Sequence, residues 1–262
     1  MQPHAEMPSH GPRSAATTRV GALYEACVGA KTAEARARVA TQLAELWTVS
    51  ESKDRAEIAI HWAKSLEATA EILEDSSGTL ELASRIGGLL PFAEYRTAAF
   101  GLAFARTLFH AAASSGDLER RRHCAQQIED LIDEGAPFAT PEIALVYAQA
   151  VYAWVLLDTQ RTQTREAATP LEALVQGRHR SASSVATPEL GYELVKVWLL
   201  EAMHGKSAMT AGRELELERL VAAPNPNAGP DLDEWLTQFA SVQHGLEDFA
   251  VKLLGLYRTQ RS

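Results

Sequence analysis

Cysteine is scarce in this chain of 262 residues. Cys27 and Cys124 are its only cysteines, they lie far apart in the sequence, and each sits within an apolar helical pattern. Small domains that depend on disulfides carry several closely spaced cysteines and belong to oxidising compartments. The sequence therefore excludes a disulfide framework, and we expect the protein to be cytoplasmic.

Long hydrophobic segments are also missing. The longest stretch without a charged residue is 143–157, which falls short of the roughly 20 residues that a membrane-spanning helix needs. The amino terminus carries no apolar segment of the kind found in secretory signals. We expect no membrane partner.

Basic residues are outnumbered by acidic ones, and the formal net charge is −9. Binding to a phosphate backbone needs a concentrated Lys and Arg surface. We therefore expect no nucleic-acid partner, and a charged partner should be basic. The sequence also has no phosphate-binding loop, nucleophile elbow, zinc-binding helix motif or Cys-x-x-Cys pair. For this reason we assign no catalytic residue, no metal and no cofactor.

A repeated phrase is the strongest positive signal. Residues 91–94 resemble residues 137–139 at an offset of 46, and residues 186–190 resemble residues 139–143 at an offset of 47. The flanking segments carry apolar residues at helical spacing and end in short polar turns. Repeats with a period in this range are typical of stacked helical hairpins.

A second phrase repeats in step with the first. It consists of an apolar residue, Glu, any residue, Leu and an apolar residue, and it occurs at 128–132, 171–175 and 217–221. Its outer positions share one helix face, so Ile128, Leu171 and Leu217 should be buried in equivalent sites while the Glu stays in water.

These patterns predict an all-α fold, an α-solenoid of about five antiparallel hairpins with a C-terminal capping helix. Residues 1–15 contain prolines without apolar periodicity, which predicts a disordered tail. The remainder, 16–262, should be one helical domain, with hairpins at about 17–49, 53–90, 93–135, 140–180 and 187–223 and the cap within 231–259. Thr32 should cap the second helix of the first hairpin, and in the second hairpin the first helix should stop at 75–78, before a helix at 79–90.

Two features resemble the tetratricopeptide repeat superfamily. The turn 116–119 reads Gly-Asp-Leu-Glu and is followed by Ala125, and small Ala residues alternate with large apolar ones in 98–109 and 144–157. The resemblance implies a right-handed superhelix of helix pairs that binds peptides or protein segments in its concave groove. HEAT-like repeats are nearer in period, since tetratricopeptide repeats recur about every 34 residues.

Polar residues interrupt the predicted first helix of three hairpins. Arg106 and His110 form an i, i+4 pair, and Gln149 and Lys196 occupy equivalent places in the next two hairpins. Such groups either pair within the structure or line a groove. Three aromatic residues nearby extend the candidate groove or simply pack in the core; they are Tyr152, Tyr192 and Trp198.

Two basic segments, 120–123 and 178–180, either meet an acidic partner or form a solvated surface.

We expect the protein to be an interaction scaffold that binds a protein or peptide in a groove lined by the first helices, and we leave a homo-oligomer open. One alternative is a regulatory sensor that encloses a ligand or peptide in a helical pocket. The other is an all-helical enzyme, which requires a carboxylate or second histidine beside Arg106 and His110.

Overall fold

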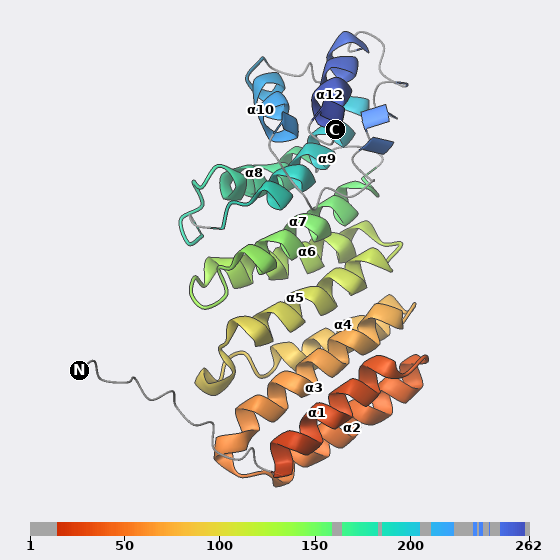
Figure 1. The fold of residues 1–262 in the computed structure, drawn as a ribbon, viewed down its shortest axis with the longest axis vertical. Coiled ribbons are helices and arrows are strands. Elements are labelled where there is room, and N and C mark those ends of the chain that lie inside the picture. Colours follow the sequence, from red (N-terminus) through yellow and green to blue (C-terminus); the bar gives the residue numbers. More distant parts are fainter. Residues whose placement is uncertain are drawn as a thin grey trace, which may run out of the picture.

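The computed structural model describes residues 15–158, 164–182, 185–204, 211–222, 233–234, 236–237, 241 and 247–259. The predicted all-α fold is confirmed, because these residues form helices and contain no strand. The helices, labelled in Figure 1, are α1 (Ala15–Gly29), α2 (Ala33–Val49), α3 (Ser52–Ile72), α4 (Ser76–Gly87), the short η1 (Ala93–Tyr95), α5 (Ala98–Ala113), α6 (Leu118–Asp133), α7 (Pro141–Val155), α8 (Thr164–Val175), α9 (Pro188–His204), α10 (Ala211–Ala222) and α12 (Glu247–Thr259).

The helices stack along the long axis of the molecule, from α1 and α2 at one end to α10 and α12 at the other (Figure 1). We call α1, α3, α5, α7 and α9 the first helices, and α2, α4, α6, α8 and α10 the second helices. Each first helix packs on the next first helix, and α2, α4, α6 and α8 each pack on the first helices before and after them, whereas α10 packs on α9 and α12. Within the described part of the chain, no two second helices pack extensively on each other. The first helices therefore form one continuous layer, which the second helices cover on one side.

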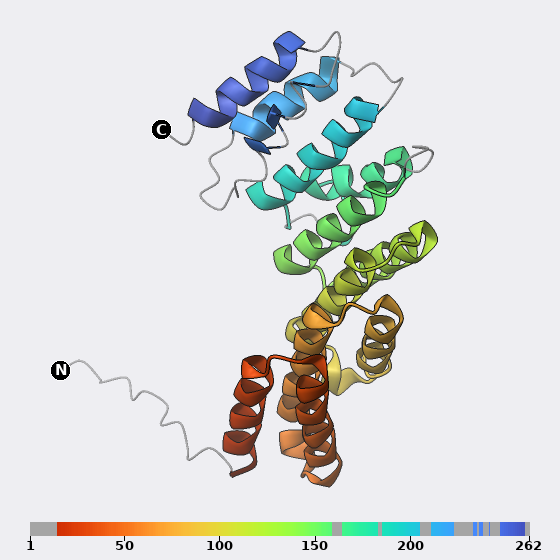
Figure 2. The same cartoon turned by 90° about the vertical axis from the view of Figure 1, so that its right-hand side faces the viewer.

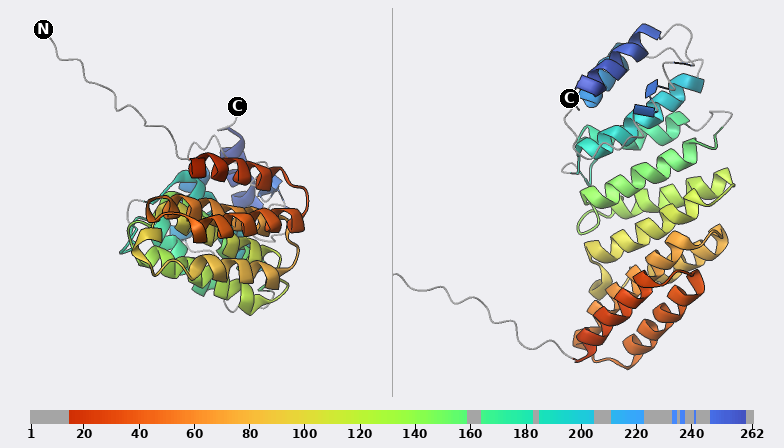
Figure 3. Two further views of the ribbon diagram at one scale, coloured as in Figure 1. Left: turned by 90° about the horizontal axis from the view of Figure 1, so that it is seen from below. Right: turned by 45° about the vertical axis from the view of Figure 1, so that its right-hand side comes forward.

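The direction of the helices changes along this stack, as the side view in Figure 2 shows. Figure 3 gives the end-on view and a further side view of the same succession. None of the helices among the described residues is both long and apolar enough to cross a bilayer. The predicted tail falls mostly outside the described residues, as does much of the predicted cap region before α12.

Three of the first helices begin with the same cap. The hydroxyls of Thr97, Thr140 and Thr187 each accept a hydrogen bond of 3.3 Å from the backbone N–H three residues later. This is the bond that an N-cap threonine forms to satisfy a free amide at the start of a helix. The caps are 43 and 47 residues apart.

The cap positions correct the predicted start of the third hairpin at residue 93. The sequence placed the start of this hairpin at about residue 93, and residues 93–95 form a single turn, η1, before α5 starts after Thr97. The similarity between 91–94 and 137–139 does not mark the cap, because Thr97 is followed by Ala-Ala, whereas the other two caps are followed by Pro-Glu. The common pattern is instead a buried apolar residue two positions before each threonine, occupied by Tyr95, Phe138 and Val185.

The segment 75–78 is a helix start, although its sequence predicted a loop before a helix at 79–90. The Asp75 carboxylate accepts hydrogen bonds of 3.0 Å from the N–H groups of Ser77 and Gly78. Asp75 is thus the N-cap of α4, which ends at Gly87. A run of Asp, Ser and Gly is typical of loops, and here it forms the first turn because the aspartate satisfies the free amides.

The core is formed where first and second helices meet. One cluster extends from α1 to the start of α5 and a larger one from α4 to α12, and both are in contact with Leu90 and Phe104. Ile128, Leu171 and Leu217 are all fully buried, as the repeated phrase predicted.

The glutamates of that phrase are not simply solvated, in contrast to the prediction. Each accepts a hydrogen bond from a later helix: Glu129 from the Tyr147 hydroxyl, Glu172 from the indole of Trp198, and Glu218 from Lys252. Burial raises the pKa of both Glu129 and Tyr147. The three glutamates therefore link consecutive parts of the stack, although each remains partly exposed.

Candidate functional site

A pocket of about 350 Å³ lies between α3, α5 and α7, on the side of the first helices. Three of the residues predicted for the groove, Arg106, His110 and Gln149, line it together. Arg106 and Gln149 each lie nine residues after the threonine cap of their helix, so equal helical phase directs both to the same place. The remaining lining residues are Glu67, Glu71, Phe109, Glu142, Leu145 and Val146.

Arg106 forms an ion pair across the pocket with Glu67 of α3, at 3.2 Å. The arginine side chain is about half exposed, whereas the side chain of Glu67 is only 18% exposed. Burial raises the pKa of Glu67, and the positive charge of Arg106 opposes part of that rise. The structural pairing considered for Arg106 is thus present, and it leaves the guanidinium accessible from the pocket.

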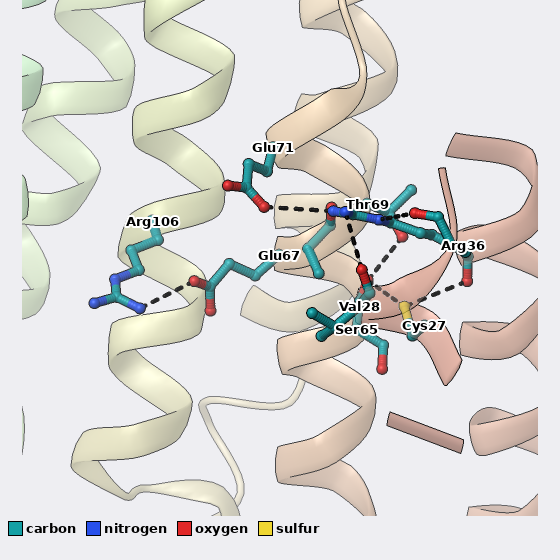
Figure 4. A network of polar contacts seen from close by, with 10 residues as sticks. Cys27, Val28, Arg36, Ser65, Glu67, Thr69, Glu71 and Arg106 are labelled. Carbon is teal, nitrogen blue, oxygen red and sulfur yellow. Dashed lines mark hydrogen bonds and ion pairs between the residues drawn. The ribbon is translucent and has the colours of Figure 1, made fainter. Parts of the chain in front are cut away.

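Glu71 lies one turn after Glu67 on α3 and forms an ion pair with Arg36 of α2 (Figure 4). One carboxylate oxygen of Glu71 is 3.4 Å from the guanidinium of Arg36, and the other points away from it. The Glu71 side chain is 62% exposed. It therefore keeps an oxygen available to the pocket.

Burial lowers the pKa of His110, with Glu71 raising it and Arg106 lowering it by smaller amounts. The neutral imidazole is therefore favoured at neutral pH. The enzyme alternative required a carboxylate near Arg106 and His110, and Glu67, Glu71 and Glu142 meet that condition. However, no ion pair joins His110 to a carboxylate among the described residues.

Lys196 and Tyr152 continue this side of the first helices toward α9. The Lys196 ammonium lies 4.6 Å from the centre of the Tyr152 ring and 2.7 Å from the Glu193 carboxylate. Like Arg106 and Gln149, Lys196 lies nine residues after the cap of its helix. Tyr192, one turn before it, is almost entirely buried.

Trp198 does not belong to this set. It is buried, its indole N–H donates a 2.7 Å hydrogen bond to Glu172 of α8, and the Arg213 guanidinium lies 5.5 Å from the ring centre. Two residues along a helix correspond to a rotation of about 200°. Trp198 and Lys196 therefore lie on opposite sides of α9, and Trp198 faces the second helices. The prediction that Trp198 lines the groove is corrected.

The basic run at 120–122 is structural, and it is not a solvated face. Arg120 donates to the hydroxyls of Ser76 and Ser77 at the start of α4. Arg122 donates to Glu166 of α8 at 2.9 Å. The arginine between them, Arg121, is bound to three backbone carbonyls, as described next.

Two arginines that the sequence analysis did not single out as a pair form matching clamps. The Arg36 clamp is the set of bonds from Arg36 of α2 to the carbonyls of Ala30, Val28 and Ala68. The Arg121 clamp is the set of bonds from Arg121 of α6 to the carbonyls of Ser115, Ala113 and Ala153. In both clamps the acceptors are 6, 8 and 32 residues away from the arginine.

Each clamp joins the carboxyl ends of two neighbouring first helices through the second helix between them. Both arginines lie four residues after the N-cap of their helix, which is Thr32 in α2 and Asp117 in α6. Helix C-termini expose carbonyls that carry partial negative charge, and a guanidinium can satisfy several of them at once. The equal spacing is visible in the sequence, but the carbonyl partners are not.

Comparison of the chain with family models, curated proteins and solved structures found no match. Among the described residues, no group of three or more His, Cys, Asp or Glu side chains is arranged to hold a metal ion.

Proposed function

We propose that this protein is an α-solenoid scaffold, similar in build to tetratricopeptide or HEAT-like repeats, that binds a protein or peptide segment in the cytoplasm. In this proposal the segment lies in a groove along the first helices α3, α5, α7 and α9. The second helices cover the opposite side of that layer and supply its core.

One observation carries the proposal: Arg106, Gln149 and Lys196 occupy the same position after the caps of three successive first helices. Equal phase on stacked helices gives a row of polar side chains along this side of the layer. Arg106 and Gln149 share a pocket, and Tyr152 contacts Lys196. A row of spaced polar and aromatic groups is suited to an extended ligand, which can contact several of them at once.

The test is site-directed photocrosslinking. A photoreactive amino acid replaces Gln149 in the full chain, and a control variant carries it at the exposed Glu81 of α4. After irradiation in an extract of the native cells, the variant with the photoreactive group at position 149 should crosslink to a protein or peptide. The variant with the group at position 81 should not crosslink to the same protein or peptide. The proposal is refuted if position 149 gives no crosslinked product, or if all of its products also form from position 81.

Substitution of the row provides a second measurement on the captured partner. Lys196→Gln removes the contact with Tyr152 and places no new charge beside Glu193, and Arg106→Ala removes the other end of the row. Together they should weaken binding of the captured segment, and circular dichroism should show the helices intact. Unchanged affinity would place the partner elsewhere on the protein.

A further inference from the structure

We infer that the pocket between α3, α5 and α7 binds an arginine side chain of the partner segment, an inference that rests on the proposed function. Its volume, about 350 Å³, is at the small end of ligand pockets. A pocket of this size accommodates one long side chain rather than a folded surface.

The charge of the pocket favours a cation. Glu67, Glu71 and Glu142 line it, and Arg106 compensates only Glu67, its ion-pair partner. Glu71 is bound by Arg36 through one oxygen and keeps the other, as Figure 4 shows. Exposed Glu142 forms no ion pair with another residue in the part of the chain that the structure describes. Two carboxylates, on α3 and on α7, thus face the pocket without full compensation.

A second hollow extends this acidic region past the end of α3. It has a volume of about 430 Å³, shares Glu71 and His110 with the pocket, and adds Glu74 and Ser114. A partner chain whose side chain enters the pocket can continue along this hollow. The acidic lining on both sides of Glu71 makes the pair of hollows complementary to a basic segment.

The arrangement of acceptors favours arginine over lysine. Besides the carboxylates, the pocket offers the amide oxygen of Gln149 and the ring of His110, which burial keeps neutral and able to accept a hydrogen bond. These acceptors come from three helices, α3, α5 and α7. A guanidinium has five N–H donors and stacks on aromatic rings, and Phe109 supplies such a ring here.

The experiment selects ligands from a random-peptide display library with the full chain as bait. We expect the enriched peptides to share one arginine. Each is then resynthesised with that arginine replaced by lysine or by citrulline, which keeps the shape and removes the charge. The citrulline peptide should bind at least about tenfold more weakly, because citrulline is neutral and the carboxylates lose their counterion. The lysine peptide keeps the positive charge and should lose less affinity.

Matched protein variants locate the effect. Glu142→Gln and Glu71→Gln should each weaken the arginine peptides several-fold and bind the citrulline peptides as the wild type does. The control Glu81→Gln, on the exposed side of α4, should change neither affinity.

Two outcomes overturn the inference, and they differ in what they say about the scaffold. If citrulline and both pocket variants leave the affinity unchanged while Gln149→Ala or Tyr152→Ala lowers it, the groove binds peptides without an arginine anchor. If no enriched peptide responds to Gln149→Ala or Tyr152→Ala, the proposed function fails as well.

Discussion

Replacing Arg36 by methionine should destabilise the N-terminal third of the protein. Methionine keeps most of the apolar stem and removes the guanidinium, which is nearly buried and donates to the carbonyls of Val28, Ala30 and Ala68. A hydrogen bond contributes about 1 kcal/mol net, so the loss of three should lower the free energy of unfolding by about 3 kcal/mol. Leaving the carbonyls without a donor accounts for most of this effect.

Urea unfolding followed by circular dichroism measures the loss, with Arg38→Met as the control. Arg38 lies on the same helix but is exposed, so its substitution should change the stability by less than about 0.5 kcal/mol. Amide hydrogen exchange in α1 should also become faster in Arg36→Met, because the clamp holds the end of that helix. If Arg36→Met is as stable as Arg38→Met, water satisfies the three carbonyls and the clamp contributes nothing.

Three further predictions test the core and the site. Leu174→Ala, at a fully buried position, should lower the stability by about 2–5 kcal/mol and cause the C-terminal half to unfold separately in urea; a single transition at the wild-type midpoint contradicts this. Gly101→Ala should cost about 1–3 kcal/mol by thermal unfolding, because the added methyl would lie 2.5 Å from the buried ring of Phe138; a wild-type melting temperature would show that the ring moves aside. Burial lowers the pKa of His110, so the unfolded chain takes up that proton first and the wild type should lose stability as the pH falls below about 6.5. His110→Gln should lack this part of the loss, and identical pH profiles would exclude it.

The sequence predicted the helices well where their ends are determined locally. Thr32 was expected to cap α2, and its hydroxyl accepts the Ala35 N–H at 3.2 Å. The starts of α4 and α5 were missed for opposite reasons. Asp75 is the N-cap of α4, but its segment was predicted to be a loop. Residues 91–94 belong to a repeated sequence that lies before α5, but they were used to place the start of the hairpin. The hydrogen bonds of the N-caps determine where α4 and α5 start, and the repeated sequence alone does not.

The candidate site was predicted only in part. Equal helical phase brought Arg106 and Gln149 to one pocket, because phase along a helix follows from residue number. The acidic half, Glu67 and Glu71, was missed because α3 does not carry the repeated phrases and acidic residues on a helix are usually solvated. That these two residues reach the pocket depends on how α3 packs on α5, which no local pattern encodes.

The second helices pack on the first helices and meet one another through polar side chains, such as Arg120 with Ser76 and Arg122 with Glu166, and this has a consequence for how the sequence can vary. An apolar substitution in a second helix needs to be accommodated mainly by the first helices that it touches. A substitution in a first helix meets neighbours on both sides of the layer as well as the second helices behind it. In natural variants of this chain, correlated changes should therefore run from one first helix to the next, while the second helices diverge more independently, except at Arg36 and Arg121 and at Arg120 and Arg122, which join second helices to one another.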